Sequence, residues 1–186
     1  NANRRPIVLA VEAKADEEFG KPIATELRGL SPDSDKPERV KRLARAVLNR
    51  SLDTHVKSLR YQLLHSLAAT AIKAKERGAK LGVLLIHEFI SLLLDFDKFS
   101  SNASDLKNFV TTVPGWEQQT VVTGKLLPPI TLTGNKNVPS DQLVTIGKVR
   151  TLIPLDARER ARIPAGFNPR TRQFLVASPS TTDLTD

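Results

Sequence analysis

The chain of 186 residues contains no cysteine and no methionine. Without thiols it can form neither a disulfide framework nor a thiolate metal site, and a thiol nucleophile is excluded. Aromatic residues make up only 5% of the sequence, which disfavours a base-stacking platform for single strands. No apolar run approaches the ~20 residues of a membrane helix, so we expect no membrane association and a cytoplasmic protein.

Several common motifs are also missing. There is no P-loop and no Gly-x-Gly-x-x-Gly, so a nucleotide cofactor is unsupported. No Gly-x-Ser-x-Gly elbow is present, which removes one familiar hydrolase arrangement. His55, His65 and His87 lack the spacing of zinc ligands, and we interpret them as polar packing residues. Because residue 1 is Asn, we expect that the sequence does not begin at a native start codon.

Positive charge is in excess. The net charge is +8 and the pI is about 10.0, with 17 Lys and Arg against 10 Asp and Glu in residues 1–80. A basic balance favours polyanionic partners such as nucleic acid. A solvated basic surface is the alternative interpretation.

Two apolar runs and the helix between them predict the fold. Ile7–Val11 predicts an interior strand, and Leu81–Ile86 predicts a second one. Leucine and alanine repeat every four residues from about residue 55 to Arg77, which predicts one long helix that ends at Gly78. A strand, a helix and a strand in this order imply a crossover that places both strands in one sheet.

A further helix is predicted to begin near Pro37, with Asp35 as a capping residue. One of its faces is apolar. The opposite face is basic, and it is either solvated or in contact with phosphate; its residues are Arg39, Lys41, Arg42 and Arg45.

The second half of the chain predicts short elements within the same domain. Residues 90–102 suggest a loop or a short helix, followed by a helix capped by Asn102 or Ser104. Strands are predicted at Val121–Leu127, Ile130–Thr133, Leu143–Ile153 and Gln173–Ala177, with one or two helical turns at Asp156–Arg162. The predicted fold class is α/β, a mixed central sheet flanked by helices. Residues 1–186 form one domain, of which 114–178 are the strand-rich and loop-rich part.

One charged triplet follows the first apolar run. Glu12 and Lys14 are two residues apart on a strand, so they point to the same side. An acid and an amine at the end of a buried strand are costly unless they pair or hold a ligand. Glu-x-Lys triplets are frequent by chance, so a plain structural pair is the alternative. The position at a strand end, before three further acids and a glycine turn, favours a site.

Four segments together resemble a known family. They are Val-Glu-Ala-Lys-Ala-Asp-Glu-Glu-Phe-Gly at 11–20, Arg-Tyr-Gln-Leu-Leu at 60–64, Val-Leu-Leu-Ile-His at 83–87 and Thr-Ile-Gly-Lys-Val-Arg at 145–150. They resemble an uncharacterised bacterial family grouped with the PD-(D/E)XK, or restriction-endonuclease-like, nuclease superfamily. The resemblance covers residues 7–112 fairly continuously. It implies a Mg²⁺-dependent or Mn²⁺-dependent nuclease acting on DNA. An inactive nuclease-like protein that binds nucleic acid or supports an assembly is the alternative.

The resemblance also implies a second acid, which normally lies upstream of Glu-x-Lys. Only six residues precede Ile7, so that strand is missing from its usual place. We hypothesise that Asp183, in the C-terminal segment 179–186, supplies the acid because the two chain ends lie side by side, as in a circular permutant. A frayed C-terminal tail is the alternative.

The resemblance assigns roles to the remaining candidates. Asp183, Glu12 and the Ala13 carbonyl would hold Mg²⁺, a cation that prefers oxygen ligands. Lys14 would orient the attacking water or offset charge in the transition state.

Three further residues have accessory roles with open alternatives. Gln62 would reach the site from the long helix and Arg60 would contact phosphate, with helix packing as the alternative for both. Glu18 is either a second metal ligand or a surface acid in a turn. The oligomeric state stays open, a homodimer included.

Overall fold

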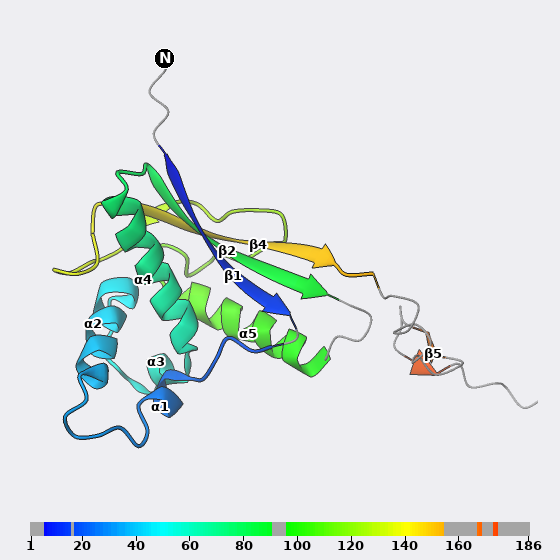
Figure 1. The fold of residues 1–186 in the computed structure, drawn as a ribbon, viewed down its shortest axis with the longest axis horizontal. Helices are drawn as coiled ribbons and strands as arrows, with labels where there is room; N and C mark the ends of the chain where they lie inside the picture. Colours follow the sequence, from blue (N-terminus) through cyan, green and yellow to red (C-terminus); the bar gives the residue numbers. More distant parts are fainter. Residues whose placement is uncertain (1–5, 16, 91–95, 155–166, 169–172, 175–186) are drawn as a thin grey trace, which may run out of the picture.

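A computed structural model describes residues 6–15, 17–90, 96–154, 167–168 and 173–174 (Figure 1). Its elements confirm the predicted α/β class. In chain order they are β1 (Ile7–Ala15), α1 (Ile23–Glu26), α2 (Lys36–Leu48), α3 (Thr54–Ser58), α4 (Tyr61–Glu76), β2 (Leu81–Ile90), α5 (Phe96–Thr112), β3 (Ile130–Thr131), β4 (Leu143–Leu152), β5 (Phe167–Asn168) and β6 (Gln173–Phe174).

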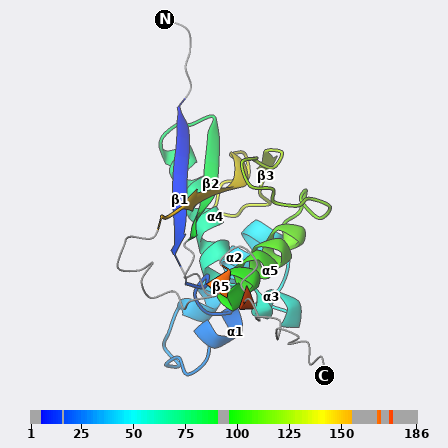
Figure 2. The same ribbon diagram turned by 90° about the vertical axis from the view of Figure 1, so that its right-hand side faces the viewer.

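The main sheet has four strands in the order β1-β2-β4-β3. β1, β2 and β4 are parallel and β3 is antiparallel to β4, so the predicted mixed sheet is confirmed. β1 and β2 are neighbours joined through α4, as the strand-helix-strand order predicted. Figure 2 shows β1 at one margin of this sheet and β3 at the other. β5 and β6 pair separately.

The prediction that β1 is an interior strand is wrong, because β1 lies at the edge of the sheet. Its outward side chains Ile7, Leu9 and Val11 are 61%, 57% and 52% exposed. Only the other face of β1 packs against α4, so a continuous apolar run was mistaken for burial on both faces.

The single helix predicted from about residue 55 to Arg77 is divided into α3 and α4. Leu59 adopts an extended backbone between them. Its carbonyl accepts a hydrogen bond from the Ile23 amide at 2.9 Å, and the Tyr61 amide donates to the Lys21 carbonyl at 3.2 Å. These bonds to the start of α1 and to the segment before it replace the helical bonds at the break, which leucine periodicity does not reveal.

Other helix boundaries differ less. α2 confirms the predicted helix, and Asp35 occupies its N-cap position although its side chain makes no capping hydrogen bond. α5 begins at Phe96, inside the segment predicted as a loop or short helix. None of the helices in the described ranges has both the length and the apolar character needed to cross a membrane.

The strand predicted at Val121–Leu127 does not form in this described segment. The segment runs beside β4 without a regular pairing pattern. It makes only isolated bridges, and Gly124 with a φ of +82° interrupts it. The segment lies close over β4, where a Cβ on Gly147 would come within 2.5 Å of the Leu126 side chain. The predicted turns at Asp156–Arg162 and the end of the strand at Gln173–Ala177 lie outside the described residues.

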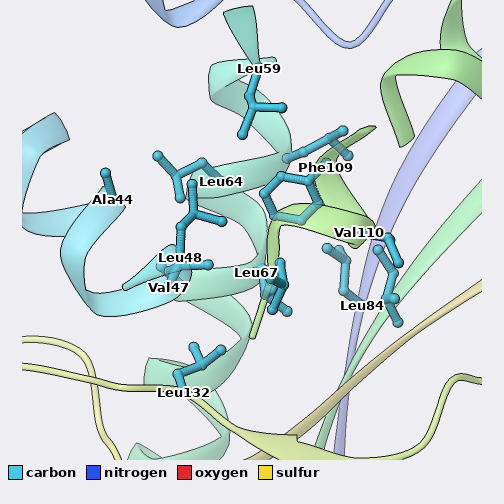
Figure 3. Packing of buried hydrophobic residues seen from close by; sticks show 14 of the residues in the cluster. Ala44, Val47, Leu48, Leu59, Leu64, Leu67, Leu84, Phe109, Val110 and Leu132 are labelled. Carbon is cyan, nitrogen blue, oxygen red and sulfur yellow. The ribbon is translucent and has the colours of Figure 1, made fainter. Parts of the chain in front are cut away.

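The core fills the space between the sheet, α4, α5 and α2 (Figure 3). α4 packs on β1 and β2 with one side and on α2 with the other. Gly82 permits the close approach, because a Cβ there would meet Thr70 and Ala74 of α4 at 3.1 Å. Each fully buried leucine contributes roughly 1.5–3 kcal/mol, so leucines such as Leu64, Leu67 and Leu84 fix α4 against the sheet.

Candidate functional site

Glu12 and Lys14 lie side by side on the face of β1 that meets α4, as the period of two predicted. The Lys14 ammonium is 3.1 Å from Glu12 Oε1. The Lys14 side chain is 5% exposed and the Glu12 side chain 15% exposed, so the pair is largely removed from water. Both residues lie toward the carboxyl end of β1.

Two side chains of α4 hold this pair in place. Gln62 bridges it: the amide oxygen accepts from Lys14 Nζ at 3.0 Å, and the amide nitrogen donates to Glu12 Oε1 at 2.6 Å. The Ser66 hydroxyl donates to Glu12 Oε2 at 3.2 Å. Gln62 thus contacts both predicted residues from the helix, and its role in a functional site stays a prediction. Ser66 was missed, although four residues along a helix return to the same face.

The Lys14 ammonium has a third oxygen neighbour. Glu17 Oε1 lies 3.7 Å away, and the Phe19 ring centroid lies 5.3 Å from the nitrogen. The ammonium therefore donates a hydrogen bond to Gln62 and lies within ion-pair distance of two carboxylates.

The charged cluster continues across the sheet onto the next two strands. Lys14 pairs in register with Glu88 of β2, and Glu88 pairs with Arg150 of β4. Glu88 is 4% exposed and accepts a hydrogen bond from Arg150 Nε at 2.7 Å, with Lys148 Nζ 3.7 Å away. Ligand sites of open parallel sheets lie at the carboxyl ends of the strands, and this cluster occupies that place.

Sequence reasoning missed the residues on β2 and β4, although a signal for them exists. Along the inward side of each parallel strand, apolar residues give way to charged ones near the carboxyl end. The inward series are Ala10, Glu12 and Lys14 on β1; Leu84, Ile86 and Glu88 on β2; and Val144, Ile146, Lys148 and Arg150 on β4.

Arg60 and Glu18 bind each other next to the pair. The Arg60 guanidinium donates to Asp105 of α5 at 2.7 Å, to Glu18 at 2.9 Å and to the Gly20 carbonyl at 2.7 Å. Arg60 therefore ties the start of α4 to α5 and to the turn after β1. Its predicted contact with phosphate, and the predicted role of Glu18 as a metal ligand, stay predictions.

The oxygen donors present fit a hard cation in kind. Glu12 offers a carboxylate and Ala13 a backbone carbonyl, both of which Mg²⁺ accepts. Glu17 and Glu88 are already engaged by cationic side chains. Within the described part of the chain no group of three His, Cys, Asp or Glu could hold a metal ion. Asp183 lies outside the described residues, so its place beside Glu12 stays a prediction.

The largely parallel sheet flanked by helices defines an α/β protein, the class in which ligand sites, where present, lie at this edge of the sheet. The chain belongs to the DUF6946 family, described as a domain of unknown function, whose model matches residues 1–151. The matched range contains Glu12, Lys14, Gln62 and Glu88 and ends before Asp183. No curated protein and no solved structure matches the chain.

Proposed function

We propose that the chain is a Mg²⁺-dependent nuclease that hydrolyses DNA phosphodiester bonds through a PD-(D/E)XK-type site on a restriction-endonuclease-like core. The observation that carries the proposal is the buried pair of Glu12 and Lys14, bridged by Gln62 from the helix that connects two parallel strands. A carboxylate and an ammonium in fixed positions at the carboxyl end of a strand suit phosphodiester chemistry.

The two oxygens of Glu12 differ in what they can still bind. Oε1 already accepts from Gln62 and lies 3.1 Å from the Lys14 ammonium, whereas Oε2 accepts only from Ser66, at 3.2 Å. A carboxylate oxygen has about two acceptor sites, so Oε2 is the oxygen left for a metal ligand bond. Glu12 Oε2, the Ala13 carbonyl and Asp183 would hold the metal.

Lys14 and Gln62 have different roles in the proposed reaction. Lys14 places its positive charge where negative charge develops on the phosphate oxygens in the transition state. The position of the ammonium is fixed before the substrate binds. Gln62 holds the Glu12 carboxylate and the Lys14 ammonium in position through its two hydrogen bonds. When bound, Mg²⁺ supplies polarisation of the phosphodiester and a lowered pKa of a bound water.

Charge supports DNA as the partner. The net charge of the chain is +8, whereas the cluster itself is balanced, with three carboxylates, Glu12, Glu17 and Glu88, against three cations, Lys14, Lys148 and Arg150. A chain with excess positive charge attracts a phosphate backbone. A cytoplasmic location belongs to the same proposal, and the number of subunits stays open.

One observation favours a second candidate, an inactive nuclease-like protein that binds nucleic acid. Among the described residues no group of three His, Cys, Asp or Glu could hold a metal ion, and the Glu12 carboxylate that the resemblance assigns to the metal is already paired with Lys14. The same experiment separates the two candidates.

Plasmid DNA is incubated with Mg²⁺ or Mn²⁺ and with the wild type, Glu12→Ala or Lys14→Ala. We expect both variants to lose cleavage by a factor on the order of 100 or more. Mn²⁺ binding, followed by titration calorimetry, should be lost in Glu12→Ala and retained in Lys14→Ala. Asp183→Asn should lose both cleavage and Mn²⁺ binding.

The matched control is the exposed pair of Lys73 and Glu76 on α4, each changed to Ala. Thermal melts confirm that every variant is folded. Cleavage that persists in Glu12→Ala would refute the nuclease proposal. DNA binding without cleavage in the wild type would establish the second candidate instead.

A further inference from the structure

A basic hollow lies between the end of α2 and the turn at 133–136, which follows β3. Its volume is about 580 Å³. None of its lining residues belongs to the cluster around Glu12 and Lys14, so the hollow is a separate place; α2, which forms one of its walls, packs on α4 (Figure 1). The residues that line it are Arg42, Arg45, Asn49, Arg50, Ser51, Thr133, Gly134, Asn135 and Lys136.

The lining carries four cationic side chains and no acid. Arg50 forms an ion pair with Asp53 at 2.8 Å. Arg42, Arg45 and Lys136 have no carboxylate within ion-pair distance among the residues that the structure describes. A hollow with this lining repels cations and favours anions.

The two walls of the hollow are joined by hydrogen bonds. The Gly134 amide donates to the Ala46 carbonyl at 2.9 Å, and the Asn135 side-chain amide donates to the Arg42 carbonyl at 3.0 Å. Gly134 has a φ of +71°, and a Cβ there would come within 2.7 Å of Ser140. The turn is thus held against α2 and the hollow exists before any ligand binds.

The helix dipole of α2 is a simpler explanation for cations near the hollow, but it explains only some of the four. The carboxyl end of α2 carries partial negative charge, which favours nearby cations. That accounts for Arg45 in the last turn and for Arg50 just beyond it. It does not account for Lys136, which comes from another segment, or for Arg42, which lies before the last turn.

The local field is positive. The pKa of the Glu38 carboxyl is lowered first by the hydrogen bond from Lys41 and by its charge, and further by the charges of Arg42 and Arg45. The nearest acid on α2 therefore feels the same arginines that line the hollow, and it lies outside the lining.

We propose that this hollow binds phosphate groups, as a second site separate from the Glu12 and Lys14 pair. Arginine guanidinium groups bind phosphate oxygens with two parallel hydrogen bonds, and the hydroxyls of Ser51 and Thr133 add donors. The ligand class is a phosphate anion carried by a nucleic-acid backbone or by a small phosphorylated molecule. The proposal does not rest on the nuclease reaction.

The test uses the full chain in EDTA, so that cleavage plays no part. A fluorescein-labelled 20-nucleotide single strand is titrated with the wild type and with the triple variant Arg42→Gln, Arg45→Gln, Lys136→Gln. The control triple, Arg28→Gln, Arg77→Gln, Lys107→Gln, removes the same charges from exposed sites that lie outside the hollow. Each triple removes three positive charges from the net +8.

We expect the hollow variant to bind at least about tenfold more weakly. Its salt slope should fall by about 2, because each phosphate contact made on binding releases roughly 0.7 counterion and the variant loses three such contacts. The control should change affinity less than about threefold. Equal losses in both triples, or no wild-type binding to either ligand class, would overturn the proposal.

Competition with pyrophosphate and ATP identifies the source of the phosphate. Displacement of the strand by ATP at equal phosphate concentration, lost in the hollow variant, assigns the site to small phosphorylated molecules. Displacement only by longer oligonucleotides assigns it to a nucleic-acid backbone. Failure of plasmid cleavage in the other experiment leaves this binding result unchanged.

Discussion

Replacing Lys14 by methionine tests how the buried pair contributes to stability. Methionine keeps much of the apolar stem but removes the ammonium, and it leaves the Glu12 carboxylate 15% exposed with only Gln62 and Ser66 as partners. Breaking a buried ion pair costs about 3–5 kcal/mol. Because Glu12 keeps two hydrogen-bond donors, we expect the lower end, about 3 kcal/mol. At about 2–4 °C per kcal/mol, Tm should fall by about 6–12 °C.

Replacing both charges should cost less than replacing one. In Glu12→Leu, Lys14→Met no buried charge is left unpaired, since Glu17 is 62% exposed, and such apolar replacements are often neutral or stabilising by about 1–4 kcal/mol. We therefore expect the double variant to be more stable than Lys14→Met alone. The control is Lys73→Met, whose pair with Glu76 is 64% and 51% exposed and should contribute less than about 1 kcal/mol.

The assay is urea unfolding followed by far-UV circular dichroism and by the fluorescence of Trp116, the single tryptophan, which is fully buried. A double-mutant cycle gives the coupling free energy between Glu12 and Lys14. If the two single substitutions add to within about 0.5 kcal/mol, the residues are not coupled and the reasoning fails. A cost for Lys14→Met as small as that for Lys73→Met would refute it equally.

Two more predictions concern charged groups near helix starts. Arg60→Lys should lower the free energy of unfolding by about 1–3 kcal/mol in urea, because one ammonium cannot replace the forked donors that bind Asp105 and its neighbours; unchanged stability would contradict this. The pKa of Asp53 is lowered, first by the Val56 amide and then by Arg50, so its ionised form stabilises the fold above the unfolded pKa and this stability is lost as pH falls through the folded pKa. The Tm advantage of the wild type over Asp53→Asn should therefore shrink between about pH 6 and pH 2 in thermal melts, and a constant difference would be the opposing result.

The elements that sequence predicted well are those whose pattern reflects one local period. α2 begins and β4 begins and ends within a residue or two of the predicted positions, because an amphipathic stripe indicates the helix and a continuous apolar run the strand. The break between α3 and α4 was not predictable, since it depends on bonds from Leu59 and Tyr61 to a segment more than thirty residues away. The edge position of β1 was missed because burial on two faces and on one face give the same short apolar run.

The candidate site likewise contains residues that the sequence predicted and residues that it did not. The shared face of Glu12 and Lys14 follows from strand geometry alone, and Gln62 came from the resemblance. Glu88 and Arg150 join the cluster only because three strands have a particular register, which no single segment encodes. The predicted contribution of Asp183 concerns residues that the structure does not describe.

The edge position of β1 has a consequence for whatever binds along it. Every second backbone amide and carbonyl of β1 points away from β2, toward a side where no described strand lies. A strand that paired there would lie about 4.8 Å away, and alternate side chains of it would stand beside Glu12 and Lys14. A strand that pairs with this edge of β1 would therefore either add a side chain to the Glu12 and Lys14 pair or block access to it.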